Sequence, residues 1–254
     1  MLGKFFTVDA PFLLLSIRGE DEAADDEYQA VTRFAGLDAT DMHRISLTRE
    51  SLGPVELSDW SGIILGGGPY NVSDAPESKS TTQRRVESEL LGLIGRIVDE
   101  DYPFLGCCYG VGTLGSVIGA VIDRRYPEPV GGMKITVTDA GRDDPLFTGL
   151  PDDFDAYGGH KEAASTLPAD AVCLATSPQC PVQAFRVKEN VYATQFHPEL
   201  DLDGIDVRLD AYKNHGYFAP ESAEQLKIEA RQWNVRHPHT ILRRFIERYA
   251  RSSR

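Results

Sequence analysis

Short apolar segments alternate with longer amphipathic segments through the first half of the chain. The run PFLLLSI, residues 11–17, predicts a buried strand, and MHRISLT, residues 42–48, predicts a second one. Between them, residues 22–35 carry apolar side chains at helical spacing and stop at Gly36, which predicts a helix that ends on a glycine cap. Strands that alternate with helices in this way are typical of a parallel sheet covered on both faces.

The next strand and helix repeat this pattern and carry glycines where they meet. The apolar residues 62–65 predict a strand that runs into the loop GGGPY, and residues 83–100 carry one apolar stripe that predicts a long helix. The run YPFLG, residues 102–106, predicts the following buried strand, with a helix expected over residues 111–119. The repeat favours an open α/β sheet with loops at the carboxyl ends of its strands.

Beyond Gly131 the pattern becomes β-rich, and helical spacing returns after about residue 204. The segments VQAFRV and VYATQF, joined through residues 188–190, predict a hairpin, and residues 240–250 predict a final amphipathic helix. We therefore expect a three-layer αβα, flavodoxin-like fold with a mostly parallel sheet, an added β-hairpin region and C-terminal helices. The expected organisation is one domain over residues 1–254, with a core at about 12–200 and a helical extension at 204–252.

Composition narrows the classes of partner. The 254 residues are 41% hydrophobic, enough for a sizeable core, and the net charge of −13 disfavours nucleic acid and anionic membranes as partners. The early apolar run, residues 12–17, is too short for a signal peptide, and no segment approaches the roughly 20 apolar residues of a membrane helix. A small-molecule substrate or a protein partner is expected instead.

Four cysteines, Cys107, Cys108, Cys173 and Cys180, lack the spacing of a disulfide framework or of a structural zinc site. This usage favours a cytoplasmic protein, with no metal or cofactor expected. Cys107 and Cys108 lie side by side in GCCYG, between a predicted strand and a predicted helix.

Read as G-x-C-x-G, that stretch predicts a nucleophile at a sharp turn, with the glycines making room for the tight path of the backbone. A helix N-terminus lowers the pKa of a thiol, so Cys108 is expected to be partly thiolate, while Cys107 points into the core. The alternative is that both cysteines are small buried hydrophobic residues at a turn.

A thiolate nucleophile needs a base, and among six histidines the one in ATQFHPEL stands out. His197 and Glu199 are two residues apart in an extended segment, so both side chains point to one side and the carboxylate can orient the imidazole. The alternative is an ordinary surface pair. Backbone N–H groups of Gly68 and Tyr109, at the ends of neighbouring strands, are the candidate oxyanion donors. A phosphate-binding loop is disfavoured because no G-K-[ST] follows the glycines.

Three stretches together resemble the class I (triad-type) glutamine amidotransferases. LGCCYG resembles their nucleophile elbow, ATQFHPE their histidine-proline-glutamate signature, and IILGGGPYNV their oxyanion strand. The order and spacing match from about Phe12 to Glu199, and the resemblance is closest in kind to the glutaminase domain of GMP synthase and its stand-alone relatives. It implies that Cys108 attacks the side-chain amide of glutamine to form a γ-glutamyl thioester. It also implies that His197 transfers protons, that Glu199 orients it, and that Gly68 and Tyr109 bind the oxyanion.

Two positions differ from the family pattern. Gly112 stands where many relatives carry a substrate-contacting glutamine, and His160, in YGGHKEAASTLP, resembles a histidine-containing loop residue that lines the pocket. Both are candidate substrate-binding positions. Only about 55 residues follow Glu199, too few for a synthetase domain, so an ammonia-acceptor synthetase is a possible partner. The open alternatives are a hydrolase of a γ-glutamyl conjugate or peptide and a non-catalytic protein with a binding or regulatory role.

Overall fold

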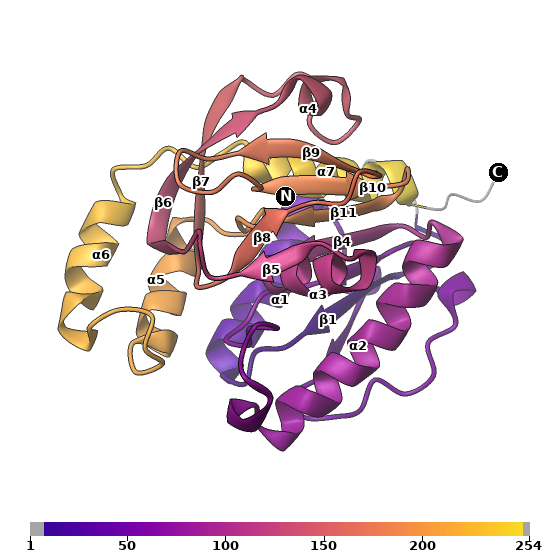
Figure 1. Cartoon of the computed structure of the whole chain (residues 1–254), viewed down its shortest axis with the longest axis horizontal. Helices are drawn as coiled ribbons and strands as arrows, with labels where there is room; N and C mark the ends of the chain where they lie inside the picture. The colour runs from indigo at the N-terminus through magenta and orange to yellow at the C-terminus, as the bar shows by residue number, and fades with distance from the viewer. Residues whose placement is uncertain (1–7, 251–254) are drawn as a thin grey trace.

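A computed structural model describes residues 8–250 of the chain, and its centre is one nine-stranded sheet (Figure 1). Five of its strands pair in parallel, in the order β2-β1-β3-β4-β11. Their carboxyl ends therefore lie along one edge of the sheet. These strands are β1 (Phe12–Ser16), β2 (Met42–Ser46), β3 (Ile63–Leu65), β4 (Phe104–Cys107) and β11 (Val191–Thr194).

The rest of the sheet is antiparallel and continues in the order β11-β10-β9-β6-β7. The predicted hairpin is confirmed, because β10 pairs with β11 across residues 188–190. A separate pair, β5 with β8, forms a small two-stranded sheet. The strands are β5 (Val121–Asp123), β6 (Glu128–Val137), β7 (Asp153–His160), β8 (Ala163–Thr166), β9 (Ala171–Thr176) and β10 (Ala184–Val187).

Helices cover both faces of the parallel strands, and β1 illustrates how. Its side chains alternate between the two faces, so Phe12 and Leu14 join the core cluster of α1 and α7. Leu13 and Leu15 join the opposite cluster, which α2 and α3 complete. The result is the expected three-layer αβα arrangement. The helices are α1 (Asp21–Ala35), α2 (Thr81–Glu100), α3 (Tyr109–Ile118) and α7 (Pro238–Tyr249).

The segment after β11 folds back over the edge where the parallel strands end. Helix α5 packs against α1 and against α6, which lies beside β6 (Figure 1). Leu200, Ile205 and Leu209 form a small core there with Tyr157 of β7. The remaining helices are α4 (Asp139–Asp143), α5 (Leu202–Tyr212), α6 (Ala223–Ala230) and the 3₁₀ turns η1 (Leu57–Asp59), η2 (Pro76–Ser78) and η3 (Pro220–Ser222).

Helices α1 and α2 match the predicted segments within two residues, and Gly36 caps α1 with a left-handed φ of 71° as expected. The region around YGGH differs from the prediction: residues 157–160 are the end of strand β7 rather than a loop, and β8 follows directly. Residues 251 and 252 of the expected extension lie outside the described residues. Within residues 8–250, none of the helices is long and apolar enough to cross a membrane.

Candidate active site

Cys108 sits at the sharp turn from β4 into α3, with φ of 53° and ψ of −89°. This positive φ is unusual for a residue other than glycine and marks a strained turn. Gly106 and Gly110 allow it, since a Cβ on Gly106 would lie 2.8 Å from the Cα of Gly110. Cys107 is buried in the core, whereas Cys108 is partly exposed, as the G-x-C-x-G pattern predicts. All four cysteines are free.

His197 and Glu199 follow β11, the strand that pairs with β4. The Nδ1 atom of His197 lies 2.8 Å from Oε1 of Glu199. Because a carboxylate accepts the hydrogen bond, Nδ1 carries the proton and Nε2 is left as the basic nitrogen. A Cβ on Gly67 would lie 2.4 Å from Cε1 and 3.2 Å from Nε2 of His197, and 3.2 Å from the Cβ of Cys108. The imidazole and the cysteine therefore flank the same glycine.

The ionisation of these three groups follows from burial. Burial raises the pKa of Cys108 to about 12 and outweighs the charges of Arg18 and Arg208, which lower it. The resting thiol is therefore protonated, which corrects the expectation of a partly formed thiolate. Burial also lowers the pKa of His197, against the charge of Glu199, so the imidazole is neutral at pH 7. A neutral thiol and a neutral base face each other across Gly67.

Glu199 remains ionised. Burial alone would raise its pKa, but the charge that His197 gains at low pH, the charge of Arg208 and the hydrogen bonds from both side chains hold that pKa well below its usual value. Nη2 of Arg208, on α5, lies 2.7 Å from Oε1 of Glu199. Arg208 thus balances the charge of the carboxylate that orients the imidazole.

Arg208 belongs to a buried charge network that the sequence analysis missed. Its Nη2 lies 3.9 Å from Oε1 of Glu27 on α1, and the same oxygen lies 2.8 Å from Nε of Arg18. Ser16 and Tyr212 complete the network, the first bonding Glu27 and the second accepting from Arg18. One signal was available: Glu27 falls on the buried stripe of α1, between Ala23 and Val31. No comparable pattern links Arg18 to Arg208.

The oxyanion candidates lie at the ends of neighbouring strands, as expected. Gly68 follows β3 and lines the same cavity as Cys108 and His197. Tyr109 is the first residue of α3, where the backbone N–H groups have no acceptor within the helix. Both positions therefore stay the predicted oxyanion donors.

Neither of the two candidate substrate-binding positions belongs to the residues that line this cavity. His160 is buried, and its ring nitrogens are engaged by Glu128 at 2.8 Å and by the carbonyl of Glu162 at 2.9 Å. The expectation that His160 lines the pocket is therefore wrong, because its ring is buried and bonds to Glu128 and Glu162 instead. Gly112 is in contact with Glu162, a residue that the sequence analysis did not single out.

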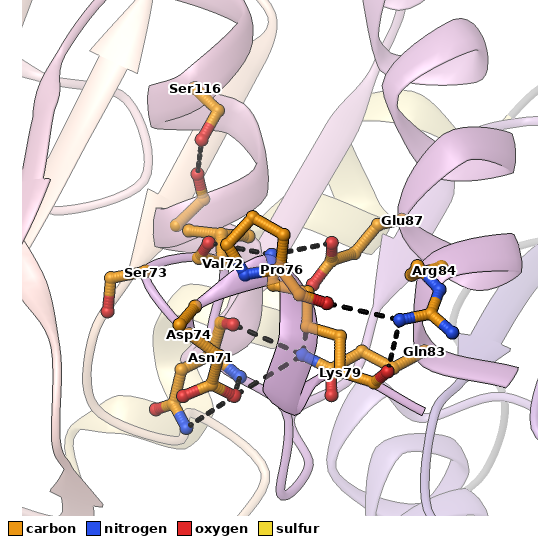
Figure 2. A network of polar contacts seen from close by, with 12 residues as sticks. Asn71, Val72, Ser73, Asp74, Pro76, Lys79, Gln83, Arg84, Glu87 and Ser116 are labelled. Carbon is orange, nitrogen blue, oxygen red and sulfur yellow. Dashed lines mark hydrogen bonds and ion pairs between the residues drawn. The ribbon is translucent and has the colours of Figure 1, made fainter. Parts of the chain in front are cut away.

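Glu162 lies where a side chain at position 112 would project. It accepts hydrogen bonds from the backbone N–H groups of Val72 and Ser73, at 2.9 and 2.8 Å. The loop that carries those N–H groups is itself fixed. Figure 2 shows Lys79 and Gln83 reaching it, with Lys79 donating to the carbonyl of Val72 at 2.9 Å. This region beside the elbow is filled by protein rather than open to substrate.

A second group of polar residues could hold a metal ion. Ligand atoms of Glu128, His160 and Cys180 lie within 4.8 Å of one another, and all three side chains are buried. They are satisfied by protein, however, since Glu128 bonds His160 directly and Cys180 donates to the carbonyl of Val182 at 3.4 Å. The cluster therefore serves as a hydrogen-bonded polar core.

The cavity itself has a volume of about 50 Å³ and brings together residues that are far apart in the sequence, from Arg18 to Phe218. Cys108 and His197 lie on its wall with Gly68, and Arg18 and Arg208 lie on the same wall. Tyr212, Tyr217 and Phe218 close the cavity from α5 and the segment after it. A partly exposed thiol, a base and two cations thus meet in one small space.

This fold and site define the class of protein. Residues 35–209 match the family model "Glutamine amidotransferase class-I", and the chain belongs to that family. Over 149 residues it is 33% identical to a glutamine-hydrolysing GMP synthase subunit of Thermoplasma acidophilum, covering 58% of this chain and 66% of that protein. Over 143 residues it is 32% identical to the GMP synthase of Thermosipho africanus, covering 55% of this chain and 24% of that protein.

The solved structures agree on the fold. The crystal structure of a glutamine amidotransferase from Thermotoga maritima is similar with a TM-score of 0.73 and 23% identity. The similarity covers 95% of this chain and 99% of that one. The α/β architecture expected from the sequence, with parallel strands between layers of helices, is therefore the architecture of this family.

Proposed function

We propose that the chain hydrolyses the side-chain amide of glutamine through Cys108, His197 and Glu199, and releases ammonia. The observation that carries the proposal is the hydrogen bond between His197 and Glu199, which leaves Nε2 of His197 basic in the cavity that also holds Cys108. Such a nucleophile, base and orienting group form the arrangement used in acyl transfer.

The first half of the reaction forms a thioester. Nε2 of His197 takes the proton of the Cys108 thiol as the sulfur attacks the amide carbon. The N–H groups of Gly68 and Tyr109 stabilise the oxyanion of the tetrahedral intermediate. His197 then gives its proton to the amide nitrogen, the C–N bond breaks, and ammonia departs. A γ-glutamyl thioester remains on Cys108.

The second half returns the enzyme to its starting state. His197 takes a proton from a water molecule, and the oxygen attacks the thioester carbon. The C–S bond breaks, the proton passes to the sulfur, and glutamate leaves. Glu199 and Arg208 keep their charges throughout, since Glu199 only orients the ring and stabilises its charged form.

A synthetase that accepts ammonia is the proposed partner. Relatives named as subunits of glutamine-hydrolysing GMP synthases support this, and the whole activity of such an assembly is a proposal for this chain. Without that partner we expect a poor glutaminase, because Gly112 offers no side chain to contact the substrate and because an enzyme that passes ammonia on is held inactive until its partner docks. The free cysteines favour a reducing compartment, and we propose the cytoplasm.

A hydrolase of γ-glutamyl conjugates or peptides is the second candidate. The position of Glu162 favours it, since this carboxylate fills the space beside Gly112, where the family resemblance implies a substrate-contacting glutamine in many relatives. A non-catalytic role is less well supported, because a binding module has no need of Cys108, His197 and Glu199 together.

Hydrolysis assays of the purified chain test these alternatives. Glutamine and a γ-glutamyl dipeptide are each supplied, with and without proteins that co-purify with the native chain. Release of ammonia that is lost in Cys108→Ala supports the proposal, and release only of the amine of the dipeptide supports the second candidate. Absence of both activities with every co-purified protein would leave the non-catalytic role.

A further inference from the structure

Two arginines stand on the wall of the Cys108 cavity, and both are buried. Arg18 is 3% exposed and Arg208 is 6% exposed. Nη2 of Arg18, together with Nε and Nη1 of Arg208, has no hydrogen-bond partner among residues 8–250. Buried donors left without an acceptor are costly and are rare in folded proteins. They point to an acceptor that arrives with a ligand.

Each of the two guanidinium groups forms its ion pair within the protein through only one of its nitrogens. Arg18 pairs with Glu27 through Nε, and Arg208 pairs with Glu199 through Nη2. An arginine has five N–H groups in a planar fork, and the fork matches a carboxylate. The three unpartnered nitrogens are buried, and both arginines line the cavity, so these are the N–H groups left over for an acceptor bound there.

The remaining wall is largely apolar and aromatic. Ile205 and Tyr212 of α5 line the cavity with Phe218 from the segment after it. Ionic hydrogen bonds are stronger where water is excluded. Arg18, Tyr212 and Phe218 lie outside residues 35–209, the part of the chain that matches the family model.

We propose that Arg18 and Arg208 form a carboxylate subsite in the Cys108 cavity, so that the amide substrate carries a carboxylate held by both guanidinium groups. The inference rests on the proposed function, because it names a property of the substrate that Cys108 attacks. Two sources of the carboxylate share this chemistry. One is the α-carboxylate of the glutamyl part, and the other is a carboxylate on the amine that leaves.

Binding measurements distinguish the two sources in protein that does not turn over. Cys108→Ala protein is titrated by calorimetry with two matched pairs of ligands. L-Glutamine against 4-aminobutanamide removes only the α-carboxylate. γ-Glutamylglycine against γ-glutamylmethylamide removes only the carboxylate of the amine. We expect a preference of about 10- to 100-fold for the carboxylate-bearing member of one pair, as for a charged hydrogen bond in a closed site.

The decisive variant is Arg18→Met with Glu27→Gln, made in the Cys108→Ala protein. It removes a cation and its buried counter-ion together, so no unpaired charge stays behind. The preference should disappear. The matched control is Arg231→Met with Asp206→Asn, an exposed arginine–carboxylate pair between α5 and α6 that should keep the preference. Arg18→Lys keeps the ion pair but loses the fork, and should weaken the preference several-fold.

The outcomes test the carboxylate subsite independently of the hydrolysis reaction. No preference in either pair, or a preference that persists in the Arg18→Met, Glu27→Gln protein, overturns the subsite. If the double variant does not fold, an unchanged preference in Arg18→Lys overturns it instead. Hydrolysis by the chain with Cys108 intact is scored separately, so carboxylate binding without turnover would refute the proposed function and leave the subsite standing.

Discussion

Glu162 occupies the space into which a side chain at Gly112 would project. A Cβ on Gly112 would lie 2.7 Å from Oε1 of Glu162 and 2.8 Å from Cγ2 of Val72. The carboxylate has little freedom to move aside, because the N–H groups of Val72 and Ser73 hold both of its oxygens. The glycine is thus a packing requirement of Glu162 as well as a difference from the family pattern.

Gly112→Gln is therefore expected to harm the protein rather than restore a glutamine contact. Overpacking of this kind costs about 1–3 kcal/mol of unfolding free energy, which urea unfolding will measure. Gly92→Gln is the control for the same exchange at an open helical position, since Gly92 is exposed on α2 and a Cβ there meets nothing within 4 Å. Glu162→Ala added to Gly112→Gln should recover part of the loss. A tighter glutamine complex in Gly112→Gln alone would contradict this view of the site.

A glutamine analogue that carries an electrophile is expected to label Cys108 and to spare Cys107. Only Cys108 lines the cavity, whereas Cys107 is buried behind the turn and burial raises the pKa of its thiol well above the usual value. Peptide mapping by mass spectrometry measures the site of labelling. Cys107→Ala should still be labelled and Cys108→Ala should not. Label found on Cys107 would remove Cys108 from the mechanism.

The pH dependence of kcat/KM should respond in opposite directions to two substitutions around His197. The imidazole acts as a base only when neutral, so activity falls as the pH drops through its pKa, which burial places below 6.5. Glu199 raises that pKa, so Glu199→Gln should move the acidic limb to lower pH and reduce the rate by about 10²–10⁴-fold. Arg208 lowers it, so Arg208→Met should move the limb to higher pH.

Rate profiles from pH 4 to 9 measure both shifts, with a substrate concentration well below KM. The Arg231→Met, Asp206→Asn protein serves as the control for loss of an arginine that does not line the cavity. Shifts in the same direction for Glu199→Gln and Arg208→Met would contradict the charge arrangement described here.

Cys108→Gly is expected to be more stable than Cys108→Ala, although neither carries a thiol. Alanine retains the Cβ that makes a φ of 53° unfavourable, and glycine relieves that strain, which is of order 1–3 kcal/mol in such turns. For a chain of this size about 1 kcal/mol corresponds to roughly 2–4 °C in Tm. Thermal unfolding followed by circular dichroism measures the difference. Equal melting temperatures would argue against stored strain at the turn.

Local sequence patterns were sufficient to predict those elements and contacts that are formed by residues close together in the sequence. The apolar stripe and Gly36 predict α1, and the spacing of His197 and Glu199 predicts their contact, because each of these features is complete within a short segment. Strand β7 was not recognised, since AYGGH lacks the β-branched residues that mark a strand.

Long-range contacts could not be predicted in the same way. Arg18 and Arg208 are 190 positions apart, and only the folding of α5 against α1 brings both to Glu27. The state of the Cys108 thiol was also missed, because the helix N-terminus is visible in the sequence while the extent of burial is not. The contact between the two arginines and Glu27 and the burial of the thiol both depend on tertiary packing.

The reacting groups and part of the cavity wall come from different parts of the chain. The turn at Cys108 and the pair His197 and Glu199 come from the ends of core strands, whereas Tyr212, Tyr217 and Phe218 come from α5 and the segment beyond it. A gene duplicate that exchanged Tyr217 and Phe218 but kept Arg208, which pairs with Glu199 from α5, would change the cavity wall while its reacting groups stay unchanged. A change of specificity in this chain therefore need not pass through an inactive intermediate.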